Sequence, residues 1–222
     1  MASPQTPSVS KYFSWRAMLV AGVFFLLVAG LLLGTARLIE KRFVAKNFGV
    51  VESQLIYRSG QIQAGLIEQT LEEKRIRVVV NLQGVEHDNA DQLAEAKAIE
   101  TFEIESHRFP MAGDGVGTVE KYAQAVALLA KAEKDRVPTL IHCAAGSQRT
   151  GGTVAAFRLL VQGATPQAAY DEALRYDWNP RKDTAWPVWL NQNMAAIAQR
   201  LVELKAIETV PNPLPVFGAL GE

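Results

Sequence analysis

The chain has 222 residues and a formal net charge of zero, because 23 basic side chains balance 23 acidic ones. A chain without a basic excess lacks the broad electrostatic surface that binds nucleic acid, so we expect no nucleic-acid partner. Only one cysteine is present, which excludes an internal disulfide framework.

The N-terminal part of the chain contains one long apolar segment. Ala17 to Gly34 runs for eighteen residues without a charge, and residues 35 and 36 extend it to the length that spans a bilayer core. Basic and aromatic side chains flank this run, as they do at the edges of membrane spans. We therefore expect a transmembrane anchor at residues 17–36, preceded by an N-terminal flank at residues 1–16.

Two other interpretations of this segment stay open. Gly34, Thr35 and Ala36 are small residues of the kind found at signal-peptide cleavage sites, so a signal segment is one alternative. The run is longer than the usual apolar region of a signal peptide, which favours an uncleaved anchor. A buried core helix fits the pattern less well, because the run is apolar on every face.

Strand-like and helix-like runs alternate after a charged connector at residues 37–48. We expect strands at 55–58, 77–82, 102–109 and 138–142, and helices at 63–74, 91–101, 118–135, 150–162, 167–176 and 186–205. Thr165 and Pro166 are typical of an N-cap and a first helical residue. The alternation predicts an α/β fold with a mainly parallel central sheet flanked by helices, in a domain at residues 49–206. A proline-rich tail at residues 207–222 follows.

The segment from His142 to Thr150 lies between an expected strand and an expected helix, and it contains the only cysteine. The first N–H groups of a helix have no partner within the helix, so a loop in this position can surround an anion with backbone amides. Gly146 allows a backbone conformation that a side chain would obstruct, and the Arg149 guanidinium can bind two phosphate oxygens. The residues that we expect to bind phosphate are Ala144, Ala145, Gly146, Ser147, Gln148 and Arg149.

Cys143, at the start of this loop, is the candidate nucleophile. The helix N-terminus and Arg149 both stabilise negative charge, so we expect the pKa of this thiol to lie below its ordinary value. The thiolate is the reactive form of cysteine. The Thr150 hydroxyl can donate a hydrogen bond to the sulfur, and a ring N–H of His142 can hold the loop in position.

The motif formed by His142, Cys143, five further residues, Arg149 and Thr150 resembles the signature of the cysteine-dependent protein tyrosine phosphatase superfamily. The Arg-Thr ending and the small size of the chain are similar to the dual-specificity branch. Residues 55–61 and 78–82 resemble segments of its bacterial and fungal members, so the resemblance covers roughly residues 48–206. It implies a phosphatase fold of the dual-specificity type and a phosphocysteine intermediate on Cys143.

A phosphatase of this type needs a general acid for the leaving oxygen, and the family supplies an aspartate from a loop upstream of the cysteine. Residues 109–117 contain three glycines and a proline, and Asp114 stands where the family's Pro-x-x-x-Asp pattern places the acid. An aspartate before glycine is also a common turn pair. Asp88 and Asp91 compete for the role, because their polar stretch follows an earlier strand.

The resemblance implies a phosphatase that hydrolyses phosphotyrosine, and also phosphoserine or phosphothreonine, with Asp114 as acid and then as base. Together with the expected anchor at residues 17–36, it predicts a membrane-tethered enzyme. The loop amides and Arg149 neutralise the phosphate charge, so we expect neither a metal nor a cofactor. A lipid or inositol phosphate phosphatase is an alternative that a membrane anchor favours. Ala144 and Ser147 stand where some relatives that act on inositol phosphates carry lysines. A non-catalytic phosphate-binding module is the alternative of another class.

The localisation follows from the anchor. We expect a single-pass protein of the bacterial inner membrane with a monomeric catalytic domain. Basic residues flank both ends of the apolar run, so the positive-inside rule leaves the orientation open. The single cysteine favours the periplasmic side, because it has no internal partner with which to form a disulfide there.

Overall fold

The computed structural model describes residues 18–30 and 45–218 of the chain. The chain divides into two compact units, one up to Phe43 and one from Val44 onward. The described part of the first unit is a helix over residues 18–30, and most of its apolar side chains are exposed. The anchor expected at residues 17–36 continues into residues outside the described part. Within the described ranges, no helix is long and apolar enough to cross a membrane.

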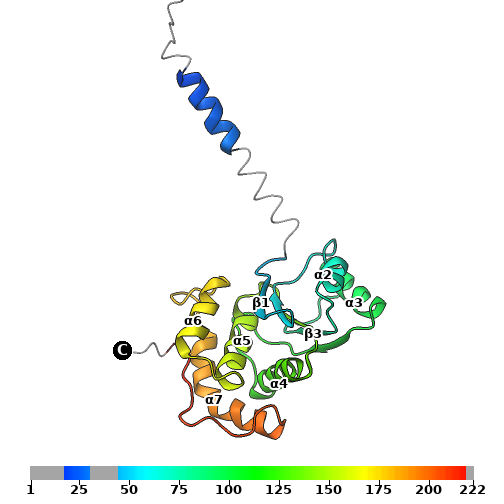
Figure 1. Ribbon diagram of the computed structural model, residues 1–222, viewed down its shortest axis with the longest axis vertical. Coiled ribbons are helices and arrows are strands. Elements are labelled where there is room, and N and C mark those ends of the chain that lie inside the picture. The colour runs from blue at the N-terminus through cyan, green and yellow to red at the C-terminus, as the bar shows by residue number, and fades with distance from the viewer. Residues whose placement is uncertain (1–17, 31–44, 219–222) are drawn as a thin grey trace, which may run out of the picture. The chain divides into compact units, whose positions relative to one another are not determined.

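A sheet forms the centre of the second unit, between the helices (Figure 1). It has five strands in the order β1-β2-β5-β3-β4. Four neighbouring strands run parallel: β2 (Ile56–Ser59), β5 (Thr139–His142), β3 (Val78–Asn81) and β4 (Glu105–Arg108). β1 (Gly49–Glu52) pairs antiparallel with β2 at one edge. The predicted α/β fold with a mainly parallel sheet is confirmed, and β1 is an edge strand that the sequence pattern does not indicate.

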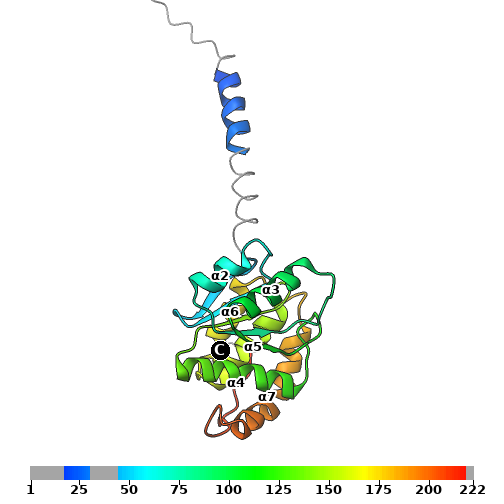
Figure 2. The same ribbon diagram turned by 90° about the vertical axis from the view of Figure 1, so that its right-hand side faces the viewer.

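Helices cover both faces of the sheet (Figures 1 and 2). α2 (Ile67–Glu73) and α3 (Ala90–Thr101) pack on one face, and α4 (Val119–Asp135), α5 (Gln148–Leu160), α6 (Pro166–Arg175) and α7 (Ala185–Glu203) pack on the other. Side chains alternate along β5, so Leu140 joins the core with α2 while Ile141 joins the core with α4 and α5. Burial on both faces explains why the parallel strands are rich in Val, Ile and Leu.

The helix ends follow local signals in the chain. Thr118 accepts the Lys121 N–H at the start of α4. Thr165 caps α6 directly before Pro166, as predicted. α2 begins at Ile67 rather than at residue 63, because residues 64–66 form a turn. These small shifts leave the expected order of strands and helices unchanged.

Residues 204–218 contain no helix or strand, yet they pack against the last helices. The Phe217 side chain is buried, and its ring centroid lies 4.6 Å from that of Trp186 and 5.5 Å from that of Trp178. Its backbone exchanges two hydrogen bonds with the Asn191 side chain. Each aromatic pair contributes about 1 kcal/mol beyond its buried area. The packed region therefore extends past residue 206 to Phe217.

Candidate active site

The loop of residues 143–149, the phosphate loop, connects β5 to α5 at the carboxyl end of the parallel strands. Ligands of such sheets bind at this edge. Gly146 has φ 74°, and a Cβ added to it would lie 2.5 Å from the Gly60 nitrogen. Only glycine fits both constraints. α5 begins at Gln148 rather than Thr150, so its first N–H groups belong to the loop.

Three consecutive carbonyl groups of the phosphate loop accept hydrogen bonds from residues outside the loop. The Gln61 N–H donates to the Ala144 carbonyl at 3.1 Å, Asn47 Nδ2 donates to the Ala145 carbonyl at 2.9 Å, and Arg58 Nη2 donates to the Gly146 carbonyl at 2.8 Å. A peptide unit is planar and trans, so its N–H points away from its C=O. The N–H groups of residues 145–147 therefore face away from these donors and into the loop. Consecutive inward N–H groups form an anion-binding nest.

The Cys143 side chain is buried within this ring of amides, and the Gly146 N–H donates to its sulfur at 3.2 Å. Burial opposes ionisation of the thiol. Hydrogen bonds from Thr150 and Gly146 and the charge of Arg149 outweigh that effect, so the pKa of Cys143 lies below its ordinary value. The Thr150 hydroxyl is buried and bonds to no oxygen or nitrogen atom of the described residues, so it is available to the sulfur.

The Arg149 side chain extends from the first turn of α5 and is half-buried. Its Nη1 donates a long hydrogen bond of 3.5 Å to the Leu82 carbonyl, and its Nε has no partner within residues 18–30 and 45–218. A guanidinium carries five N–H donors in one plane. Most of these donors are therefore available to an anion held by the neighbouring amides.

A second guanidinium, that of Arg58, is buried against the outside of the phosphate loop. Its Nη1 lies 3.8 Å from Glu172 Oε1, and its central carbon lies 3.9 Å from the centre of the Tyr176 ring. Burial lowers the pKa of Arg58 to about 10, although the charges of Glu172, Tyr176 and Cys143 act in the opposite direction. Arg58 is therefore still charged at neutral pH, where it adds positive potential near the thiolate.

Asp114 lies on the exposed loop that follows β4. Its Oδ1 accepts the Val116 N–H at 3.0 Å, which closes a tight turn. The Tyr122 hydroxyl donates to the carbonyl of Gly115 at 2.6 Å. Gly115 has φ 90°, and a Cβ added to it would lie 3.1 Å from the Gln148 carbonyl. The loop that carries Asp114 therefore contacts the start of α5, directly beside the phosphate loop.

The two competing carboxylates, Asp88 and Asp91, lie near the start of α3. Asp91 Oδ1 accepts the Ala64 N–H at 2.8 Å, which joins α3 to the segment before α2. Asp88 is exposed and has no hydrogen bond or ion pair among the described residues. Asp114, by contrast, lies on a loop that contacts α5.

His142, the last residue of β5, points to the opposite face of the sheet from Cys143. Its Nε2 lies 3.1 Å from Oε2 of Glu95 on α3, and both side chains are buried. Glu95 also accepts hydrogen bonds from Gln61 Nε2 at 2.9 Å and Asn81 Nδ2 at 2.8 Å. The ring N–H that is predicted to hold the loop therefore meets a carboxylate on α3.

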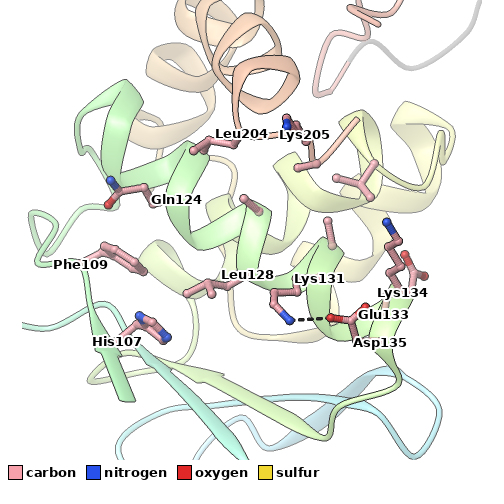
Figure 3. A pocket seen from close by; sticks show the side chains of 14 residues that line it. His107, Phe109, Gln124, Leu128, Lys131, Glu133, Lys134, Asp135, Leu204 and Lys205 are labelled. Atoms are coloured by element: carbon pink, nitrogen blue, oxygen red, sulfur yellow. Dashed lines mark hydrogen bonds and ion pairs between the residues drawn. The ribbon is translucent and has the colours of Figure 1, made fainter. Parts of the chain in front are cut away.

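A separate cavity of about 820 Å³ is lined by residues of β4, α4 and the segment at the end of α7 (Figure 3). Leu128 contributes to its apolar wall, and the ion pair of Lys131 with Asp135 lies beside it. None of its lining residues belongs to the phosphate loop. This cavity is therefore distinct from the candidate active site.

A protein-family model matches most of the second unit. The family described as "DSP-PTPase phosphatase fused to NAD+ Kinase" matches residues 44–185, more than half of the chain. The chain belongs to this family. It is therefore a protein-tyrosine/dual-specificity-type phosphatase, as the motif around Cys143 predicts. No curated protein matches the chain.

Several solved phosphatase structures have a similar fold. TpbA from P. aeruginosa is 22% identical with a TM-score of 0.56, and the match covers 72% of this chain and 91% of TpbA. The core catalytic domain of the PP-IP phosphatase SIW14 from S. cerevisiae is 18% identical with a TM-score of 0.57, covering 76% and 99% of the two chains. PTPMT1 in complex with PI(5)P is 15% identical with a TM-score of 0.52, covering 72% and 97%. At these identities the likeness establishes the fold alone.

Three residues that organise the site carry no sequence motif: Asn47, Glu95 and Tyr122. Each acts through a contact with a backbone or side chain that is distant in sequence. The position of Glu95 emerges only from the fold, in which Gln92, Glu95 and Ala98 lie on the buried side of α3. A carboxylate on the buried side of a helix indicates a buried partner.

Proposed function

We propose that the protein hydrolyses phosphomonoesters at the phosphate loop, with Cys143 as nucleophile and with Arg149 and the loop amides as phosphate ligands. This proposal rests on the carbonyls of Ala144, Ala145 and Gly146, which accept hydrogen bonds from donors outside the loop. Because these carbonyls point outward, the N–H groups that follow them point toward the buried sulfur. Donors held in place in this way stabilise the charge on the equatorial oxygens during phosphoryl transfer.

In the first step the Cys143 thiolate attacks phosphorus in line with the leaving oxygen. A sulfur–phosphorus bond forms, the phosphorus–oxygen bond to the alcohol or phenol breaks, and Asp114 gives its proton to the leaving oxygen. In the second step Asp114, now a carboxylate, takes a proton from water as the water oxygen attacks phosphorus. The sulfur leaves as a thiolate, and inorganic phosphate is released.

Thr150 and His142 support this reaction without contacting phosphorus. A hydrogen bond from the Thr150 hydroxyl stabilises the sulfur anion both as attacking group and as leaving group. His142, the residue before Cys143, is held by its ion-pair contact with Glu95. The two side chains lie on opposite faces of the sheet, so their contributions are separable by substitution.

Phosphotyrosine is the substrate that we propose first, followed by phosphoserine and phosphothreonine. The side chains of Ala144, Ala145 and Ser147 are small and uncharged, so the loop interior offers no extra cation for a polyphosphate. Among the proteins of similar fold, a TpbA variant has been solved in complex with phosphotyrosine. Both observations support a substrate with a single phosphate group on an amino-acid side chain.

Lipid or inositol phosphates are the second candidate substrates. SIW14 is a PP-IP phosphatase, and PTPMT1 has been solved with PI(5)P, so this fold accommodates such substrates in other proteins. A membrane anchor would bring the site close to lipid headgroups. The uncharged interior of the phosphate loop argues against highly phosphorylated inositols, so a lipid monophosphate is the stronger form of this candidate.

We also propose that residues 17–36 anchor the enzyme in the bacterial inner membrane, with the catalytic domain in the periplasm. The uncharged apolar run supports the anchor, and the single cysteine supports the periplasmic side. A C-terminal alkaline phosphatase fusion is expected to be active, and the chain is expected to stay in the membrane fraction after carbonate extraction. An N-terminus beginning after Ala36 in the mature protein would overturn the anchor, and an inactive fusion would overturn the orientation.

The reaction is tested with the full chain in detergent, in buffer with a chelator. Phosphate release is measured from phosphotyrosine, phosphoserine, inositol phosphate and phosphatidylinositol phosphate, for the wild type and Cys143→Ser. We expect release from phosphotyrosine by the wild type and none by the variant, which should still bind vanadate. Vanadate binding without release from any substrate would indicate a phosphate-binding module. Preferential release from the lipid would replace the first candidate substrate by the second.

A further inference from the structure

Glu95 is a buried carboxylate at the point where three neighbouring strands end. Its residue is 2% exposed. β2, β5 and β3 are consecutive in the sheet, and each is followed or terminated by a polar side chain that reaches Glu95. Gln61 follows β2, His142 ends β5 and Asn81 ends β3. One carboxylate therefore joins the carboxyl ends of three strands.

Each of these contacts leads to the active site. His142 precedes Cys143, and the Gln61 N–H donates to the Ala144 carbonyl. On the third strand, Asn81 Oδ1 accepts the Gln83 N–H at 2.8 Å. That bond fixes the segment whose Leu82 carbonyl receives Arg149 Nη1. The nucleophile thus directly follows a residue that contacts Glu95, and the carbonyl that binds the phosphate-binding guanidinium belongs to the residue after Asn81.

The protonation of this cluster follows from its donors and acceptors. Burial opposes ionisation of Glu95, but His142, Gln61 and Asn81 outweigh it, so the pKa of Glu95 lies below its ordinary value. An ionised carboxylate only accepts hydrogen bonds, so the Gln61 and Asn81 amides donate to Glu95, and His142 Nε2 lies 3.1 Å from its Oε2. Removing the charge would leave the Gln61 and Asn81 amides with a poorer acceptor, and polar groups in such a site are costly to leave unpaired.

We propose that Glu95 is a positioning residue for the phosphatase reaction, which holds the ends of β2, β5 and β3 together and so fixes Cys143 relative to Arg149. The inference rests on the proposed role of Cys143 as nucleophile. Glu95 acts through His142, Gln61 and Asn81 and contacts neither the thiol nor the substrate.

A positioning effect and a direct charge effect on the thiol have opposite signs. The charged and titratable groups that act on Cys143 are Arg149 from α5, Arg58 from β2 and Tyr122 from α4, with Asp114 acting on Tyr122. Removing a nearby negative charge alone would lower the thiol pKa. Losing the position of the sulfur between its hydrogen-bond donors would raise it.

The test compares Glu95→Gln with Glu100→Gln, an exposed carboxylate on the same helix. Cys143 is the only cysteine, so the rate of alkylation by iodoacetamide as a function of pH reports this thiol in the absence of substrate. For Glu95→Gln we expect a higher midpoint pH and a kcat on the order of tenfold lower, with KM nearly unchanged. Glu100→Gln should match the wild type in all three measurements.

An unchanged midpoint and kcat in folded Glu95→Gln would overturn the inference, as would a lower midpoint. If Glu95→Gln loses the near-ultraviolet circular dichroism of the folded chain, Gln61→Leu carries the test, because it removes a single half-buried donor. It should shift the midpoint upward by a smaller amount, and no shift would equally overturn the inference. Release of phosphate by Cys143→Ser would instead contradict the proposed function itself.

Discussion

The Tyr122 hydroxyl, in the first turn of α4, donates a hydrogen bond of 2.6 Å to the carbonyl of Gly115, the residue that follows Asp114. Tyr122 is fully buried, and burial together with the charges of Asp114 and Cys143 raises the pKa of its phenol. The hydroxyl therefore stays protonated over the whole pH range of a phosphatase assay. This bond holds the backbone next to the proposed general acid against the core of the domain.

Tyr122→Phe tests the importance of this bond for the acid. The buried Gly115 carbonyl would lose its donor, so we expect the variant to lose about 1–2 kcal/mol of unfolding free energy. We expect kcat to fall on the order of tenfold for a phosphoserine peptide and less for p-nitrophenyl phosphate, whose leaving group needs little protonation. Tyr170→Phe, on a half-buried ring that packs against Trp178, is the control. Equal losses on both substrates would contradict a role in placing the acid.

Asp114→Asn and Asp88→Asn compare two of the three candidate acids. An amide cannot donate a proton to the leaving oxygen, so kcat for aliphatic phosphates should fall by about 100-fold. The loss for p-nitrophenyl phosphate should be much smaller. Asp88→Asn, in an exposed residue without a hydrogen bond or ion pair in the described part of the chain, should retain full activity. Steady-state kinetics on the two substrates make the comparison, and a large loss in Asp88→Asn would transfer the acid role to that residue.

The lowered thiol pKa predicts a pH-dependent contribution of Cys143 to stability. Between the lowered pKa and the ordinary one, the folded state binds fewer protons than the unfolded state, so stability rises with pH in that window. The contribution is complete above about pH 8.5 and is lost as the pH falls through the folded-state value. Urea unfolding of the wild type and Cys143→Ser should show a difference that grows from acidic pH to about pH 8.5. A difference that is constant with pH would disagree with the lowered pKa.

Thr150→Val isolates the hydroxyl that faces the sulfur. Without this donor the thiolate is less stable, so the midpoint of the alkylation curve should move to higher pH. Thr153→Val removes a hydroxyl from the next turn of the same helix, where it bonds to the Arg149 carbonyl instead of the sulfur. We expect the midpoint of this control to stay close to that of the wild type. Equal shifts in both variants would assign the effect to the helix rather than to the hydrogen bond.

Arg58→Met tests the guanidinium outside the phosphate loop. Without the Arg58 guanidinium, Glu172 keeps only its ion pair with Arg158, and the Gly146 carbonyl loses its donor. Because one partner of a buried ion pair is removed, we expect the unfolding free energy to fall by about 3 kcal/mol. Arg200→Met removes an arginine that is paired only at the exposed surface, and it should leave the unfolding free energy nearly unchanged. Denaturant unfolding measures both. A loss in Arg58→Met as small as that in Arg200→Met would show that the buried pair does not brace the loop.

The sequence predicts those parts of the site that are contiguous in the chain. Cys143, Gly146, Arg149 and Thr150 fall within eight residues, so strand, loop and helix can be recognised from residue types and spacing. Asp114 can be located because its loop is rich in glycine and follows a strand. The succession of strands and helices along the chain and most helix boundaries follow from apolar runs and caps, as at Thr165, whereas the order of the strands in the sheet does not.

The parts of the site that the sequence does not predict depend on contacts between residues that are distant in the chain. Asn47 and Ala145 are 98 positions apart, and Arg58 and Gly146 are 88 positions apart, so no local pattern marks these hydrogen bonds. β1 has four residues and half-exposed Val50, which is too short and too open for its apolar pattern to indicate a strand. Local chemistry therefore predicts the reacting groups, whereas the groups that hold them in position emerge from the fold.

The phosphocysteine intermediate is tested most directly by rapid acid quenching of the full-length Asp114→Asn enzyme with p-nitrophenyl phosphate in the presence of a chelator. The activated phenol leaves without help from an acid, whereas hydrolysis of the intermediate lacks its base, so a phosphoryl group should accumulate on sulfur. Mass spectrometry of the peptide that contains Cys143 should show one phosphate adduct, absent from the Cys143→Ser variant. Turnover without any adduct on Cys143, or turnover that survives in Cys143→Ser, would contradict the proposed mechanism.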